Sequence, residues 1–167
     1  MRDRRAVCCY DHPRPALTAD TVVLRTAEGV AERPQEILLI QRGNQPFAGQ
    51  WALPGGFVDR GESPEEAARR ELYEETRLSV GKLTQVGAFG DPGRDPRGWV
   101  VSVAYVVRLE NADNVAVAGD DASRVQWWPA NRLPSLAFDH TKIVEMALRL
   151  ATTEASAVYR GPADPLR

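Results

Sequence analysis

Seven of the chain's 23 acidic residues lie within residues 59–75, and three of them fall where a helix would bury them. Placed at 100° per residue, Glu71, Glu74 and Glu75 overlap the side that carries the apolar residues Ala67, Ala68, Leu72 and Leu78. Glu71 and Glu75 are also like charges four positions apart, which costs roughly 0.2–0.5 kcal/mol even in water. Partial burial raises this cost unless a cation neutralises the pair, and oxygen ligands favour Mg²⁺ or Mn²⁺. A solvated acidic face is the alternative explanation.

Composition and spacing exclude several other kinds of protein. The two histidines, His12 and His140, are far apart, and the adjacent Cys8 and Cys9 lack zinc-finger spacing, so a zinc site is not expected. A net charge of -2 disfavours binding to nucleic acid by bulk electrostatics. The apolar run at residues 100–107 is far shorter than the ~20 residues that span a bilayer, and the N-terminus is too short in apolar residues for a signal peptide. We therefore expect a cytoplasmic protein without a membrane or nucleic-acid partner.

The acidic helix has a clear start in the sequence. Ser63 is a suitable N-cap, Pro64 suits the first helical position, and Glu66 completes a capping box. The same projection places Thr76 on the solvent-facing side of this helix. A second helix is expected over residues 139–152, with an apolar face made of Ile143, Met146, Ala147 and Leu150.

The remaining apolar segments predict strands. A length of 167 residues and a hydrophobic content of 43% predict a single domain over residues 1–167. The order of elements predicts an α+β fold with a mixed β-sheet between helices, an α/β/α sandwich in which residues 99–109 form a central strand. Strands are expected at residues 17–25, 36–41, 51–53, 57–58, 82–90, 99–109 and 124–128.

Residues 56–78 carry a motif that resembles the Nudix box, G-x5-E-x7-R-E-U-x-E-E-x-G-U, where U is a bulky aliphatic residue. Gly56, Glu62 and the run from Arg70 to Leu78 agree at every defined position but one. The exception is Arg77, which replaces the second glycine of the motif. That glycine ends the helix, and another residue in a left-handed conformation costs roughly 1 kcal/mol. Because Arg77 is no expected ligand, we expect activity to survive.

The resemblance implies a Nudix fold and the hydrolysis of a nucleoside diphosphate linked to another moiety, with Mg²⁺ or Mn²⁺. It implies that Glu71 and Glu75 are metal ligands and that Glu74 is a ligand or the general base. Arg70 is expected to orient a carboxylate of the box by a salt bridge. The resemblance also implies that Glu62 contacts a metal ion through a water molecule and that the carbonyl oxygen of Gly55 binds a metal ion directly.

Four stretches outside the box, at residues 14–18, 42–57, 89–98 and 136–140, resemble the ADP-ribose pyrophosphatase branch of the family. This resemblance implies hydrolysis of ADP-ribose to AMP and ribose 5-phosphate by a homodimer. In the loop at residues 90–98, Arg94 and Arg97 are candidates to hold phosphate or ribose oxygens through forked hydrogen bonds. Further candidates for substrate contacts are Arg42, Phe47, Trp51, Tyr10, Asp120 and Asp121. For the aromatic residues the alternative is a place in the core, and for Arg94, Arg97 and the two aspartates it is a solvated turn.

Two other functions stay open at this point. One is hydrolysis of oxidised nucleoside triphosphates of the 8-oxo-dGTP type, because the box does not specify the leaving group. The other is a non-catalytic, ADP-ribose-sensing domain of a transcriptional regulator. The intact glutamates favour catalysis, and only about 15 residues follow the last expected helix.

Overall fold

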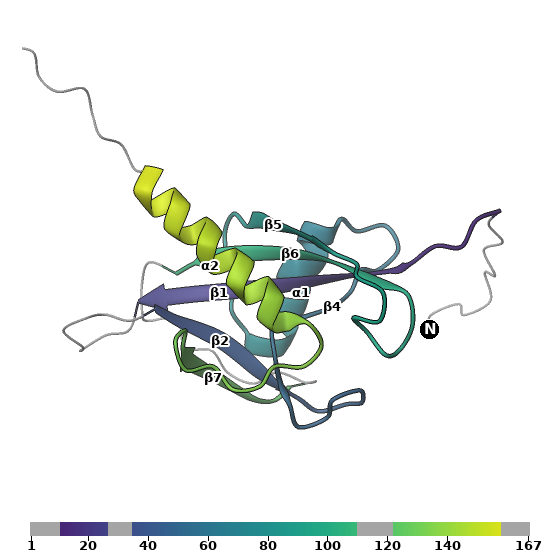
Figure 1. Ribbon diagram of the computed structural model, residues 1–167, viewed down its shortest axis with the longest axis horizontal. Coiled ribbons are helices and arrows are strands. Elements are labelled where there is room, and N and C mark those ends of the chain that lie inside the picture. The colour runs from purple at the N-terminus through teal and green to yellow at the C-terminus, as the bar shows by residue number, and fades with distance from the viewer. Residues whose placement is uncertain (1–10, 27–34, 110–121, 158–167) are drawn as a thin grey trace, which may run out of the picture.

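The computed structural model describes residues 11–26, 35–109 and 122–157. Within these ranges two helices accompany seven strands (Figure 1). Their bounds lie within a few residues of those expected from the sequence, apart from the end of the second helix, which runs five residues further. In chain order the elements are β1 Ala16–Thr26, β2 Gln35–Arg42, β3 Trp51–Ala52, β4 Gly55–Phe57, α1 Pro64–Thr76, β5 Thr84–Phe89, β6 Val100–Arg108, β7 Ala122–Pro129 and α2 His140–Ala157.

The strands form one mixed sheet in the order β3-β2-β1-β6-β5, with β4 pairing with β1 and β7 pairing with β2. β1 and β6 are parallel, and the other pairs are antiparallel. β1 changes partner along its length, because Leu24 pairs with Ile37 of β2 whereas Asp20 pairs with Gly55 of β4. The mixed sheet and the central position of β6 are therefore confirmed.

The two helices cover opposite faces of this sheet (Figure 1). On one face, Ile143 and Ala147 of α2 pack against alternate residues of the central strands, among them Val22 and Leu39. On the other face, Leu72 of α1 packs against the residues in between, Val23 and Leu38. Because successive side chains of a strand point to opposite faces, the continuous apolar runs of β1 and β2 serve both layers. The predicted α/β/α sandwich is confirmed.

The start of α1 agrees with the sequence, and its last turn differs from the projection. The Ser63 side chain accepts from the backbone N–H of Glu66 while the Glu66 carboxylate accepts from the backbone N–H of Ser63, which completes the capping box. Thr76, expected on the solvent-facing side, is fully buried. Its hydroxyl donates to the carbonyl oxygen of Leu72 at 2.6 Å, so its burial leaves no polar atom unpaired.

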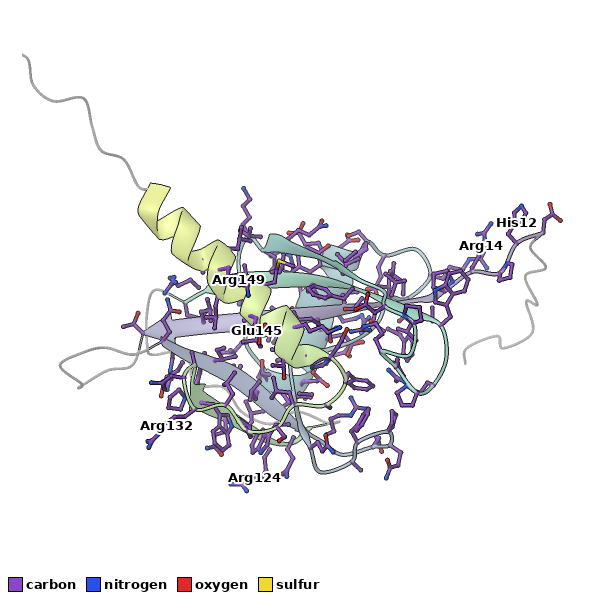
Figure 2. All side chains as sticks on the ribbon, viewed as in Figure 1. His12, Arg14, Arg124, Arg132, Glu145 and Arg149 are labelled. Atoms are coloured by element: carbon purple, nitrogen blue, oxygen red, sulfur yellow. The ribbon has the colours of Figure 1, made fainter. Side chains whose placement is uncertain are left out.

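The outer face of α2 is polar where it meets solvent. Glu145 and Arg149, four positions apart, lie on this exposed side (Figure 2). Met146, expected on the apolar face, is 49% exposed, and it lines a surface hollow together with Phe89 and Lys142. Neither of the two helices that the structure describes is long and apolar enough to cross a membrane.

Arg77 ends α1 in the left-handed conformation expected of the missing glycine, with φ 59° and ψ 13°. Its backbone N–H donates to the carbonyl oxygen of Tyr73 at 2.8 Å. A non-glycine residue is strained in this region, so replacing Arg77 with Gly should raise the free energy of unfolding by up to about 1 kcal/mol. Thermal unfolding should report this as a rise in Tm of roughly 2–4 °C, with Arg77→Ala as the control for lost side-chain contacts. A lower Tm for the glycine variant than for the alanine variant would contradict the assignment of strain.

Candidate active site

The glycine pair of β4 brings the backbone into contact with the carboxylates of α1. The backbone N–H of Gly55 donates to Oε2 of Glu75 at 2.9 Å. A Cβ atom at Gly56 would overlap the carboxylate of Glu71, and one at Gly55 would overlap the carboxylate of Asp20. Only glycine permits this close approach at both positions.

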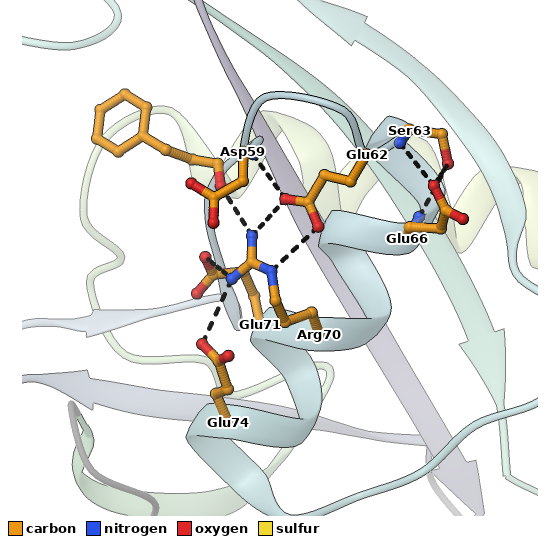
Figure 3. Close-up of polar contacts among 8 residues, drawn as sticks. Asp59, Glu62, Ser63, Glu66, Arg70, Glu71 and Glu74 are labelled. Carbon is orange, nitrogen blue, oxygen red and sulfur yellow. Dashed lines mark hydrogen bonds and ion pairs between the residues drawn. The ribbon is translucent and has the colours of Figure 1, made fainter. Parts of the chain in front are cut away.

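Arg70 links the loop before α1 to the glutamates on the helix (Figure 3). Its guanidinium donates to both carboxylate oxygens of Glu62, at 3.1 and 2.6 Å, and to Oε1 of Glu71 at 2.6 Å. It also donates to the backbone carbonyl oxygen of Phe57 at 3.0 Å and lies 3.4 Å from Oε2 of Glu74. The hydrogen bond to Glu62 raises the pKa of Arg70 and lowers that of Glu62. Arg70 therefore stays charged and fixes the rotamer of Glu71.

Two carboxylates of the box, those of Glu71 and Glu75, are largely shielded from solvent. Glu75 is only 8% exposed, and burial raises its pKa to about 8. Burial also raises the pKa of Glu71, although the neighbouring Arg70 opposes this shift. A cation bound between these two groups would stabilise their charged forms. The third carboxylate, Glu74, differs because its side chain is 55% exposed.

These residues fit an open Mg²⁺ or Mn²⁺ site better than a closed one. All the donors are oxygen atoms, from Glu71, Glu75 and the carbonyl of Gly55, and such hard ligands suit Mg²⁺. Within the described ranges, no group of three or more His, Cys, Asp or Glu side chains is placed to hold a metal ion by itself. Mg²⁺ typically uses one or two carboxylates and fills its other positions with water and substrate phosphates.

A small pocket of about 50 Å³, open to solvent, adjoins the glycine pair. It is lined by Gly55 and Gly56 together with three arginines and two phenylalanine rings, Arg42, Arg94, Arg97, Phe57 and Phe138. The arginines can bind phosphate oxygens on one side of the pocket, and the neighbouring carboxylates can bind metal ions on the other.

The two arginines of the 90–98 loop have different surroundings. Arg94 is 4% exposed and forms a forked ion pair with Asp139, at 2.7 and 3.0 Å. Arg97 is 36% exposed; its guanidinium pairs with the buried carboxylate of Asp95 at 2.6 Å and lies 4.7 Å from the ring centre of Phe57. Both arginines line the pocket, but Arg94 is buried in its wall whereas Arg97 is partly exposed to solvent.

The other expected substrate residues divide between pocket and core. The guanidinium of Arg42 lies 4.9 Å from the ring centre of Phe138, and burial lowers its pKa. The ring of Phe47 meets the same Phe138 edge-on at 4.9 Å. Trp51 instead packs against Trp128 in the core beneath α2, at 5.4 Å, and does not line the pocket. Asp120, Asp121 and Tyr10 lie outside the described residues.

Several pocket residues had no assigned role from the sequence. Phe138, Asp95 and Asp20 all line the pocket, as does His140, which the sequence placed only in the first turn of α2. The alternation of acids and arginines in residues 91–97 was a usable signal for the Asp95–Arg97 pair. Nothing in the sequence marks Phe138 or Asp20, because only the packing of β1, β4 and α2 brings them together.

Comparisons with known proteins identify the family of this chain. The NUDIX domain family matches residues 18–147, and the chain belongs to the Nudix family. It is 40% identical over 148 residues to an ADP-ribose pyrophosphatase of Methanocaldococcus jannaschii, covering 89% of this chain and 80% of that protein. It is 36% identical over 141 residues to the ADPR-responsive transcriptional repressor NtrR of Acinetobacter baylyi, covering 82% of this chain but only 54% of the repressor.

Solved structures confirm the fold. The Nudix domain of Shewanella oneidensis NrtR, solved in complex with ADP-ribose, superposes with a TM-score of 0.74 at 32% identity, covering 90% of this chain and 99% of that one. A MutT/nudix family protein from Enterococcus faecalis superposes with a TM-score of 0.77 at 35% identity, covering 87% of this chain and 65% of that one. The predicted family and fold are therefore confirmed.

Proposed function

We propose that this protein hydrolyses the diphosphate bond of ADP-ribose to give AMP and ribose 5-phosphate, using Mg²⁺ or Mn²⁺. The observation that carries the proposal is that Gly55 and Gly56, which contact the carboxylates of Glu75 and Glu71, also line a pocket with three arginines. The 40% identity to an ADP-ribose pyrophosphatase supports the choice of substrate, as does the likeness to a domain solved with ADP-ribose.

Each residue of the box has a distinct part in this proposal. Glu71, Glu75 and the carbonyl oxygen of Gly55 would hold a metal ion, which would supply positive charge to the diphosphate oxygens in the transition state. Arg70 holds Glu71 in place, and Glu62 holds Arg70. Glu74 is exposed, so it can accept a proton from the attacking water as general base, or serve as a further ligand.

The pocket residues position the substrate. Arg97 donates to phosphate or ribose oxygens, with its orientation fixed by Asp95 and by the rings of Phe57 and Phe138. Arg42 lines the same pocket beside Phe138, whereas Phe47 packs behind Phe138 against a core cluster and does not line the pocket. We assign Trp51 to packing rather than to stacking on adenine, because its ring lies against Trp128 in the core.

A substrate panel tests this choice of substrate. Initial rates with ADP-ribose, NADH, diadenosine polyphosphates and 8-oxo-dGTP should give the highest kcat/KM for ADP-ribose. A higher kcat/KM for 8-oxo-dGTP would replace the proposal with nucleoside triphosphate sanitising. Tight binding of ADP-ribose without any turnover would replace it with the sensing function, which the connected Arg70 network and the intact glutamates do not favour.

We also propose that the protein works in the cytoplasm as a homodimer, as the resemblance to ADP-ribose enzymes implies. Trp99 and Met146 are large apolar residues left 57% and 49% exposed, and each lines a surface hollow to which the 90–98 loop also contributes. Burial of such residues is a common feature of subunit interfaces. Light scattering should return twice the single-chain mass of 18.4 kDa. The single-chain mass itself would contradict the proposed homodimer.

A further inference from the structure

The segment from Leu53 to Gly55 crosses from one strand of the sheet to another. Ala52 is the last residue of β3 to pair with β2, and Gly55 is the first residue of β4 to pair with β1. The carbonyl oxygen of Pro54 already accepts from the backbone N–H of Thr21 at 2.9 Å. The amide of Leu53 belongs to neither pairing, and its residue is 1% exposed. A buried amide of this kind needs an acceptor from elsewhere in the fold.

His140 supplies that acceptor from the first residue of α2, 87 positions along the chain. The backbone N–H of Leu53 donates to Nδ1 of His140 at 2.9 Å. An imidazole nitrogen that accepts a hydrogen bond carries no proton, so the ring is neutral and protonated on Nε2. Burial also lowers the pKa of His140, which agrees with a neutral ring.

Asp20 of β1 faces the other side of this ring. Nε2 of His140 lies 3.7 Å from Oδ1 of Asp20, and the second carboxylate oxygen accepts from the hydroxyl of Ser102. Asp20 is therefore held by Ser102 on one oxygen while the other faces Nε2. A carboxylate opposite one ring nitrogen favours the tautomer with the proton on that nitrogen. The arrangement leaves Nδ1 available to Leu53.

Pro54 has no N–H, so the next backbone N–H of this segment is that of Gly55, and its acceptor lies on the opposite face of the sheet. Gly55 donates its N–H to Glu75 of α1, two residues after Leu53 donates to His140 of α2. The two helices therefore fix one short segment from both sides. The carbonyl oxygen of Gly55 and the carboxylate of Glu75 can keep their relative positions only while this segment stays in place.

We propose that His140, kept in its Nε2-protonated form by Asp20, is a positioning residue that fixes the Leu53–Gly55 segment and thereby places the Gly55 carbonyl oxygen at the metal site. The inference rests on the proposed function only in taking Gly55 as a metal ligand. Groups that orient metal ligands through hydrogen bonds commonly change metal affinity about 10- to 100-fold when they are replaced. His140 itself touches no metal ion in this arrangement.

Two substitutions of His140 by amide residues distinguish the role of Nδ1 from that of Nε2. In Asn the carbonyl oxygen is two bonds from Cβ, as Nδ1 is in His, so His140→Asn keeps an acceptor opposite Leu53. In Gln the amide atoms are three bonds from Cβ, as Nε2 is, so His140→Gln moves the acceptor away. Electron paramagnetic resonance of free Mn²⁺, without substrate, should show His140→Asn within about threefold of wild-type affinity and His140→Gln weaker by about tenfold or more.

Ile143→Val, a core substitution one turn along α2, is the matched control and should bind Mn²⁺ like the wild type. Wild-type affinity in His140→Gln, equal weakening in both His140 variants, or weakening in the Ile143→Val control would each overturn the proposal.

A second measurement needs no variant. The chain has only two histidines, so ¹⁵N spectra of the wild-type imidazoles can be assigned directly. They should show Nδ1 of His140 unprotonated and Nε2 protonated, and the reverse tautomer or an imidazolium at neutral pH would overturn the proposal even if neither variant folds. Both measurements are made without ADP-ribose, so they stand or fall separately from the choice of substrate.

Discussion

Replacing Glu75 with Gln should lower kcat for ADP-ribose by more than about a hundredfold while the protein stays folded. Gln keeps an oxygen that can accept from the Gly55 N–H but removes the negative charge from the metal site. The loss should exceed the roughly 10- to 100-fold effect of groups that only orient ligands, because a ligand itself is weakened. Steady-state rates at saturating Mg²⁺ measure the effect, and Glu71→Gln should behave in the same way.

The matched control for this substitution is Glu65→Gln. Glu65 lies on the same helix but pairs with Arg69, and it does not belong to the Arg70 network. Its variant should therefore keep the wild-type kcat. Near-wild-type turnover in Glu75→Gln at saturating Mg²⁺ would show that the ligand assignment is wrong.

The same substitution has a consequence for stability in the absence of divalent metal. Burial raises the folded-state pKa of Glu75 to about 8, from an ordinary value of 4.5. Between these two values the folded protein binds more protons at Glu75 than the unfolded chain, so the free energy of unfolding falls as the pH rises. In EDTA, Tm of the wild type should drop between pH 5 and pH 8, and the drop should be smaller in Glu75→Gln. Equal drops in both proteins would contradict the burial of a charged Glu75.

Replacing Arg97 with Ala should raise KM for ADP-ribose by about 10- to 100-fold with little change in kcat. The loss of one charge-assisted hydrogen bond to substrate is worth about 1.5–3 kcal/mol, which gives this range. Arg97→Lys serves as the control, since it keeps a charge beside the buried Asp95 but loses the forked geometry. An unchanged KM in Arg97→Ala would show that Arg97 and its loop do not bind the substrate.

Arg94→Ala should act mainly on stability. Its side chain is 4% exposed and paired with Asp139, and breaking a buried ion pair from one side costs about 3–5 kcal/mol. For a chain of this length we expect Tm to fall by roughly 10 °C. Thermal unfolding of the two single variants therefore separates the arginines. A larger fall in Tm for Arg97→Ala than for Arg94→Ala would contradict these assignments.

Most of the fold could be predicted from local patterns in the sequence. The capping box at Ser63 and Glu66 fixed the start of α1, and the apolar runs of β1 and β2 identified strands covered on both faces. The helical projection also indicated the burial of Glu75. It failed for Thr76, because a hydroxyl that bonds to the carbonyl of its own helix can be buried without penalty.

The site was less predictable where partners come from distant parts of the chain. Arg94 and Arg97 look alike in the sequence, yet Arg94 is neutralised by Asp139, 45 positions away, and Arg97 by Asp95, two positions away. The contact of His140 with Leu53 depends on where β3 ends and β4 begins. Such contacts follow from how α2 and the 90–98 loop pack on the sheet, which no local pattern encodes.

The most direct test of the central claim is to identify the products of ADP-ribose. With Mg²⁺, chromatography should show AMP and ribose 5-phosphate appearing in equal amounts, and EDTA should stop the reaction until excess Mg²⁺ is restored. Folded protein that forms no AMP with either Mg²⁺ or Mn²⁺, or that forms AMP at the same rate in EDTA, would contradict a metal-dependent ADP-ribose hydrolase built on Glu71 and Glu75.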